Sequence, residues 1–126
     1  WGHARDYVRG MWNIVQQNDP SDFVLATGIS HSVRELVECA FAEIGIRLDW
    51  AGLGPDETGR DSRSGKILVR VDPFYFRPTE VDHLEGNAAK AKAQLGWTPT
   101  VTFKDLIREM LECDLKDIQS SIKVAP

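Results

Sequence analysis

The chain has 126 residues, which is enough for one domain of modest size and too few for two. Hydrophobic residues make up 42% and charged residues 27%, as in an ordinary soluble globular chain, and no apolar run approaches the ~20 residues of a membrane span. The net charge of -4 argues against nucleic acid as a partner, because no basic face offsets the acids.

Cys39 and Cys113 lie far apart, with no CxxC or histidine spacing beside them. This argues against a disulfide framework or a zinc site and favours a reducing cytoplasm as the location. No signal-peptide pattern opens the chain, and Trp1 is not a start methionine. We therefore expect the sequence to begin within a longer protein.

The first half of the chain predicts two helices and two strands. Residues 4–17 have apolar side chains at helical spacing, so we expect an amphipathic helix ending near Pro20. Residues 22–28, DFVLATG, predict a short buried strand closed by a glycine, and residues 46–52 alternate as a second strand does. Between them, residues 33–44 carry one apolar stripe and predict a helix.

The ends of that second helix have recognisable signals. Ser30 or Ser32 can cap its start, and Glu35 stands three residues after Ser32, as in a capping box. Gly45 stands where a helix commonly ends.

In the second half, residues 53–65 are rich in Gly, Pro, Ser and charge and predict a mobile surface loop. Residues 66–72 predict a strand, and residues 87–95 and 102–119 predict helices, Asn87 serving as a helix cap. The tail SSIKVAP shows no pattern and is expected to be frayed. The predicted fold class is a small mixed α/β unit.

A catalytic centre is not evident in this sequence. The glycines at 52, 54 and 59 stand in a predicted loop, without the strand-turn-helix context of a phosphate-binding turn. Tyr7 follows Asp6 but falls on the apolar helical stripe, so we expect it to pack in the core. The two cysteines are interpreted as small packing residues. The histidines, which lack spaced partners for metal binding or catalysis, are His3, His31 and His83.

Binding chemistry is better supported, in the segment FYFRPTEVDHLEGNAAKAKAQLGWTP that starts at Phe74. Its mixture of aromatic and charged side chains is typical of a pocket wall. Arg77 can offer a fork of donors to a phosphate or a planar ring, and Glu80 can accept from sugar hydroxyls or a guanine edge. A plain surface ion pair between the two is an equal alternative. The loop with Arg60, Arg63 and Lys66 can cap a diphosphate, although a solvated charged loop is the more ordinary interpretation.

Several segments, in this order, resemble the extended short-chain dehydrogenase/reductase family. The strand-glycine segment LATG and the ending LGWTPTVTFKDLIREM identify the superfamily. The segments WGHARDYV, DFVLATG, HSVRELVE, VDPFYFRPTEVDHLEGN and KAKAQLGWTP resemble more closely the GDP-mannose 4,6-dehydratases within it. YFRPTEVD is the most specific of these segments. One departure is Gly86-Asn87, where the family often has Gly-Asp.

The resemblance implies that residues 1–126 are the C-terminal, GDP-sugar-binding region of a larger NADP-dependent lyase. In that family the Arg and Glu of the RPTEV motif are expected to touch the nucleotide, which gives Arg77 and Glu80 their role. The family's reaction oxidises C4 of the hexose with NADP, eliminates water across C5 and C6, and returns the hydride to C6. Its Tyr-x-x-x-Lys pair and its glycine-rich cofactor turn do not occur in this sequence. The resemblance therefore implies that this chain alone binds GDP-mannose, does not hold NADP and is inactive.

Two other function classes stay open. One is another member of the same superfamily, either a GDP-keto-sugar reductase or a UDP-sugar epimerase. A preference for UDP-sugars over GDP-sugars would favour the epimerase. The other is a non-catalytic module for nucleotide binding or assembly. We also expect the chain to expose apolar surface that a cofactor-binding domain would cover, and hence to form a dimer or loose oligomer.

Overall fold

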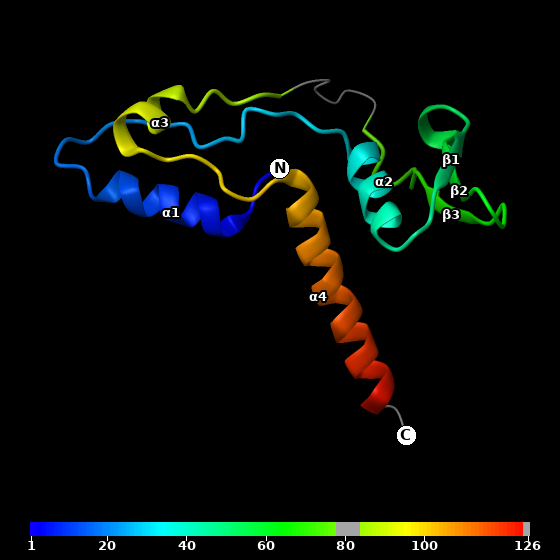
Figure 1. Ribbon diagram of the computed structural model, residues 1–126. Helices are drawn as coiled ribbons and strands as arrows, with labels where there is room; N and C mark the ends of the chain where they lie inside the picture. Colours follow the sequence, from blue (N-terminus) through cyan, green and yellow to red (C-terminus); the bar gives the residue numbers. More distant parts are fainter. Residues whose placement is uncertain (78–83, 125–126) are drawn as a thin grey trace. The chain divides into compact units, whose positions relative to one another are not determined.

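The computed structural model describes residues 1–77 and 84–124, with side chains up to residue 120. The chain divides into two compact units (Figure 1). The first contains Trp1–His31 and the described residues after position 83, and the second contains the described residues from Ser32 onward, before position 78. Helices and one three-stranded sheet together make a small mixed α/β fold, which confirms the predicted class.

The first unit consists of helices α1 (Ala4–Val15), α3 (Ala89–Leu95) and α4 (Phe103–Val124). α1 starts at His3, whose Nδ1 atom accepts the N–H of Arg5 at 3.0 Å. α3 ends at Gly96, whose φ of 62° lies in the left-handed region that glycine adopts without strain. α1 and α3 lie side by side within this unit (Figure 1).

Trp97 forms the centre of the first unit. Its side chain is buried, and its Nε1 atom donates to the backbone oxygen of Asp6 at 2.7 Å. The ring of Tyr7 lies 6.0 Å from the Trp97 ring, which confirms the predicted packing role of Tyr7. Gly10 is also buried, and a Cβ atom there would lie only 2.6 Å from a methyl group of Leu25 and 2.8 Å from Trp97 Nε1. The absence of a side chain at position 10 therefore lets α1 approach this core.

The strand predicted at residues 22–28 is not formed. The segment has no strand assignment in the described structure, and its residues are exposed or half-buried, without any that is fully buried. Lys90 ties its start by donating to Ser21 Oγ at 2.5 Å and to the backbone oxygen of Asp22 at 2.9 Å. Gly86 approaches so closely that a Cβ atom there would lie 2.5 Å from Ala26 Cβ. An apolar pattern is not sufficient for a strand, because a strand also needs a neighbouring backbone in register.

The second unit packs α2 (Val33–Glu43) beside an antiparallel sheet of β1 (Leu48–Ala51), β2 (Thr58–Asp61) and β3 (Ile67–Arg70), in the order β1-β2-β3 (Figure 1). Ser32 and Glu35 form the expected capping box, and Gly45, with φ of 75°, follows the helix as predicted. Trp50 joins sheet to helix, because its Nε1 atom donates to Glu38 Oε1 at 2.7 Å. The guanidinium of Arg34 lies 4.6 Å from the centre of the Trp50 ring.

The prediction of an unstructured loop at 53–65 is wrong, because this segment contains the 3₁₀ helix η1 (Gly54–Asp56) and β2. Asp61 makes the turn into β3: its carboxylate accepts the Ser64 hydroxyl at 2.5 Å and the N–H of Arg63 at 3.0 Å. The absence of a side chain at Gly59 permits the pairing of β2 with β1, since a Cβ atom there would lie only 3.1 Å from the Trp50 ring. The sequence pattern could not show this, because the strand depends on contacts with partners on either side.

Two smaller predictions also fail. The backbone of α4 continues to Val124, so most of the tail expected to be frayed is helical. Cys39 is half-buried as a packing residue should be, but Cys113 is exposed on α4. The expectation for Asn87 is met only in part: its Oδ1 atom accepts the N–H of Ala89, the first residue of α3, at 2.9 Å, but the N-cap position of α3 is occupied by Ala88.

Candidate functional site

Arg77 follows β3 at the end of a tight aromatic turn in the second unit. Asp72 fixes this turn: its carboxylate accepts the N–H of Phe74 at 2.9 Å, and its backbone oxygen accepts the N–H groups of Tyr75 and Phe76, both at 3.1 Å. The Arg77 side chain is exposed and has no hydrogen bond or ion pair to the other described residues. Its guanidinium is therefore accessible to an anion or a planar ring.

The pocket wall that the sequence predicts around Arg77 stays a prediction, because residues 78–83 of that segment lie outside the described residues. Phe74 is 86% and Tyr75 75% exposed, and their rings meet edge to face at 5.0 Å. Phe76 is exposed to a lesser degree. Within the described chain these rings form an open surface next to Arg77. Glu80, the other predicted binding residue, lies outside the described residues, so the alternative of an Arg77–Glu80 ion pair stays a prediction.

Arg60, Arg63 and Lys66 are exposed around the turn between β2 and β3. Arg60 donates to the backbone oxygen of Gly65 at 3.4 Å, which uses one of its donors within the turn. The Ser64 hydroxyl and the N–H of Arg63 lower the pKa of Asp61. A phosphate-binding role for this turn stays a prediction.

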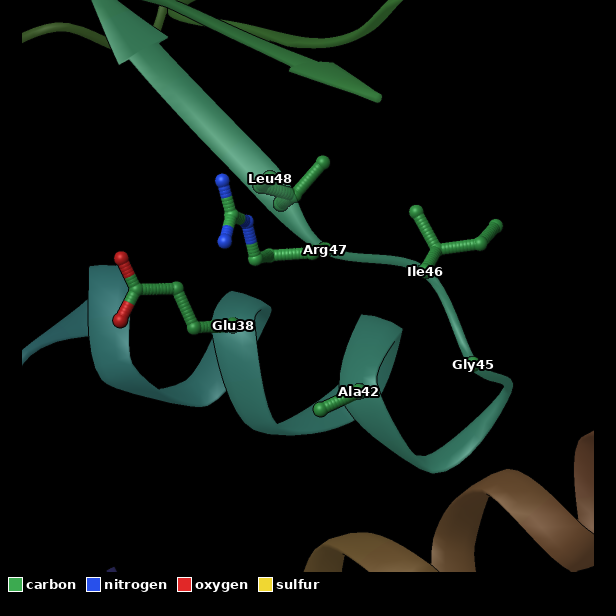
Figure 2. Close-up of a pocket in the computed structure, with 6 residues that line it drawn as sticks. All are labelled: Glu38, Ala42, Gly45, Ile46, Arg47 and Leu48. Carbon is green, nitrogen blue, oxygen red and sulfur yellow. The ribbon is translucent and has the colours of Figure 1, made fainter. Parts of the chain in front are cut away.

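A groove of about 510 Å³ separates the end of α2 from the start of β1 (Figure 2). Its lining is mixed, with Ala42, Ile46 and Leu48 beside the charged side chains of Glu38 on α2 and Arg47 before β1. Both charged groups already have partners: Glu38 accepts the Trp50 indole N–H, and Arg47 pairs with Asp49 at 3.3 Å. The groove contains no nucleophile and base in contact, so it offers a weak binding surface rather than catalysis.

Sequence reasoning gave no role to the carboxylate of Asp6, which the structure places at the centre of a hydrogen-bond network. Its side chain is 1% exposed, and it accepts the N–H of Thr100 at 2.7 Å, the Thr100 hydroxyl at 2.7 Å and the N–H of Val101 at 3.0 Å. Arg9 lies 3.2 Å away. Burial raises the pKa of Asp6, but the donors from Thr100 and Val101 and the Arg9 charge outweigh burial, so the pKa lies below its ordinary value.

This network holds the segment after α3 against α1 and leaves no free polar atom for chemistry. The carboxylate is fully occupied by structural donors, and Arg9 also donates to the backbone oxygen of Thr98 at 2.7 Å. Asp6 is therefore a structural residue and not a general base. The signal in the sequence is an acid on the opposite helix face from Val8 and Trp12, but its hydrogen-bond donors Thr100 and Val101 are more than 90 residues away.

The described histidines do not form a metal or catalytic site. His3 caps α1 and contacts Glu109 at 3.2 Å, and the His31 ring stacks on Phe103 with 3.8 Å between ring centres. His83 lies outside the described residues. Among the residues that the structure describes, no group of three or more His, Cys, Asp or Glu side chains is arranged to hold a metal ion. The same part of the chain contains no helix long and apolar enough to span a membrane.

Comparison with known proteins gives the family of the chain. A family model described as GDP-mannose 4,6 dehydratase matches residues 1–110. The chain is 52% identical to a GDP-mannose 4,6 dehydratase of Drosophila melanogaster, over 92% of this chain and 29% of that protein. It is 51% identical to the Homo sapiens protein of that name, over 92% of this chain and 31% of the relative.

A bacterial relative agrees, since a GDP-mannose 4,6-dehydratase of Sinorhizobium fredii (strain HH103) is 52% identical over 96% of this chain and 34% of its own length. The chain thus spans about a third of the length of the curated relatives that it matches. The match extends through α1, the second unit and the Trp97 core into α4. The chain belongs to the GDP-mannose 4,6 dehydratase family.

Proposed function

We propose that this chain is the nucleotide-sugar-binding part of a GDP-mannose 4,6-dehydratase, which converts GDP-mannose to GDP-4-keto-6-deoxymannose. The observation that carries the proposal is the accessible Arg77 guanidinium beside an exposed aromatic turn, in a chain about half identical to enzymes of that name. A guanidinium is suited to a diphosphate or a purine edge, because it presents several donors in one plane. Glu80, three residues further on, would accept from the ribose or the base.

The residues of this chain do not fit NADP, the cofactor that the proposed reaction uses. The glycines once considered, Gly52, Gly54 and Gly59, surround η1 and enter β2. None stands between a strand and the start of a following α-helix, where a dinucleotide-binding turn must lie: Gly52 leads only into the three-residue 3₁₀ helix η1. NADP would therefore have to be held by another part of the full-length protein. We therefore expect this 126-residue chain to bind the substrate without converting it. We expect the protein to act in the cytoplasm.

The alternatives raised by the sequence have less support. The relatives at 51–52% identity are all named as dehydratases, and neither a reductase nor an epimerase is among them. A purely non-catalytic module remains compatible with the missing cofactor turn, but it gives no reason for an exposed arginine flanked by aromatic rings. Preference among nucleotides separates these possibilities.

The proposal is tested by calorimetric titration of the chain with GDP-mannose, with UDP-glucose as the comparison ligand. We expect selective binding of GDP-mannose. Arg77→Ala should weaken the binding of GDP-mannose by about 2–5 kcal/mol if the contact between the guanidinium and the ligand is shielded from water. Arg70→Ala is the matched control, because Arg70 is an exposed arginine at the end of β3 and should leave the affinity unchanged.

The same substitutions in the full-length protein complete the test, because the binding site can need residues outside this chain. Unchanged affinity for GDP-mannose in the full-length Arg77→Ala variant would contradict the assignment of Arg77. Equal affinity for UDP-glucose and GDP-mannose would contradict the assignment of the substrate.

A further inference from the structure

Arg77 is connected to the sheet of the second unit by one short turn. β3 ends at Arg70, and a single turn over residues 73–75 leads from it to Arg77. The backbone oxygen of Asp72 accepts the N–H of Phe76, four residues further on, at 3.1 Å, which is the hydrogen bond of one α-helical turn. The direction in which Arg77 leaves the sheet therefore depends on whether this turn forms.

Asp72 has the geometry of a helix N-cap for this turn. Its Oδ1 atom accepts the N–H of Phe74 at 2.9 Å, as an N-cap side chain accepts from the second residue of a helix. Pro73 stands at the first position, where its fixed φ suits a helical turn and its missing N–H needs no acceptor. The backbone oxygen of Asp72 accepts the N–H groups of Tyr75 and Phe76. One residue thus supplies the acceptors for the whole turn.

Side-chain packing contributes little to the stability of this turn. Phe74 and Tyr75 are largely exposed, and their edge-to-face contact lies within the turn itself. A single helical turn is unstable in water, because it fixes several backbone dihedral angles for one hydrogen bond. The population of the turn therefore depends on the additional acceptor that the Asp72 side chain provides.

We propose that Asp72 is a positioning residue for the binding of the nucleotide sugar. By capping the turn, its carboxylate holds the backbone of Arg77 where the guanidinium meets the ligand. This inference rests on the proposed function of Arg77. A site that is ordered before binding loses less conformational entropy when the ligand binds, so loss of the cap should weaken binding although Arg77 itself is retained.

The charge of Asp72 has an effect of its own, which the test must separate from the cap. A carboxylate near the site repels a diphosphate and attracts a guanidinium. Asn and Ser accept the same N–H without a charge and are about as effective as Asp at an N-cap, whereas Ala has no side-chain acceptor. Asp72→Asn and Asp72→Ala are both neutral, so a comparison of these two variants isolates the hydrogen bond.

The test measures the affinity of full-length variants for GDP-mannose by calorimetric titration. We expect Asp72→Ala to bind about three- to tenfold more weakly than Asp72→Asn and Asp72→Ser, because loss of an N-cap lowers the population of the binding-competent turn by about that factor. Equal affinities of Asp72→Ala and Asp72→Asn would overturn the proposal.

Asn87→Ala is the matched control. Asn87 is exposed, and its Oδ1 atom accepts the N–H of Ala89 at 2.9 Å, so the substitution removes a hydrogen bond of the same kind from the first unit. This variant should bind GDP-mannose as the parent does. A loss of affinity as large as in Asp72→Ala would overturn the proposal, because it would show a general effect of a lost turn and not an effect on Arg77.

Amide hydrogen exchange of the full-length protein without ligand, read by mass spectrometry, tests the turn directly. The peptide covering residues 72–77 should exchange faster in Asp72→Ala than in Asp72→Asn, because the N–H of Phe74 loses its acceptor and the turn opens more often. The peptide covering the turn between β2 and β3 should exchange at the same rate in both variants. Equal exchange of residues 72–77 in the two variants would overturn the proposal.

Failure of this inference is distinguishable from failure of the proposed function. Unchanged affinity in full-length Arg77→Ala contradicts the proposed role of Arg77 and removes the basis of the inference with it. Weaker binding by Arg77→Ala, together with equal binding by Asp72→Ala and Asp72→Asn, overturns the positioning role of Asp72 alone.

Discussion

The buried carboxylate of Asp6 shows how one residue can hold together distant segments. Three donors from Thr100 and Val101 and the charge of Arg9 converge on it. Removing part of such a network leaves buried N–H groups without an acceptor, which costs more than the net contribution of an ordinary hydrogen bond. Asp6 thus contributes to stability in a way that depends on its ionisation.

Asp6→Asn should lower the free energy of unfolding at pH 7 by about 1–3 kcal/mol, because the amide offers one acceptor where the carboxylate offers two. The folded-state pKa of Asp6 is lowered, so its stabilisation is present above the ordinary value of 3.8 and is lost as the pH falls through the folded pKa. Urea denaturation at pH 7 and below pH 3.8 should therefore show a difference between parent and variant that shrinks with acidification. Asp49→Asn, at an exposed site, is the control, and a pH-independent difference for Asp6→Asn would contradict the expectation.

Among the elements, α2 shows how local signals in the sequence determine structure. Ser32 Oγ accepts the N–H of Glu35 at 3.1 Å, and Glu35 Oε2 accepts the N–H of Ser32 at 2.6 Å. Of the two serines that the sequence allowed as caps, the structure therefore selects Ser32. All of these contacts lie within four residues, so they need no tertiary partner.

Ser32→Ala should destabilise the second unit by about 1 kcal/mol, the usual effect of losing a helix N-cap. Ser30→Ala is the matched control and should change the stability little, because the Ser32 cap remains intact. Thermal unfolding followed by circular dichroism measures both. Equal destabilisation by the two substitutions would show that the cap observed here does not decide the stability of α2.

Elements that depend on distant partners were predicted less well. Residues 22–28 have a strand-like composition but form no strand, whereas β2 is formed in a segment that the sequence predicts as a loop. Thr58–Asp61 becomes a strand because Leu48–Ala51 and Ile67–Arg70 flank it on both sides. Pairing partners, and not the composition of the segment, decide between strand and loop in both cases.

For the whole molecule, the small number of buried side chains governs the tendency of the chain to associate in solution. The buried hydrophobic residues of the described chain are Ala91, Trp97 and Ile107. On α1 the large apolar side chains of Val8, Met11, Trp12 and Val15 are exposed. A chain with so little core and so much exposed apolar surface is expected to associate weakly at high concentration. The predicted dimer or loose oligomer stays a prediction that solution measurements can test.

Static light scattering of the 126-residue chain should show an average mass that rises with concentration. Val15→Lys should reduce this concentration-dependent increase in mass, because it places a charge among the exposed apolar side chains of α1. Gln16→Lys, about 100° further around the helix, should reduce the increase less. A mass equal to one chain at every concentration would contradict the expectation. A stable dimer at micromolar concentration would instead indicate an interface much larger than the exposed apolar side chains of α1 can form.

The sequence by itself determined the family, the mixed α/β class and the capping of α2, and it is the source of the proposal that Arg77 binds the substrate. These depend on short-range patterns, such as side-chain spacing, caps and the YFRPTEVD motif, that are legible within a few neighbouring residues. Only the tertiary structure decided that Asp6 is a buried structural acid, that β2 exists and that Val8, Met11, Trp12 and Val15 of α1 are exposed. Each of these depends on contacts between residues far apart in the sequence, which local spacing does not encode.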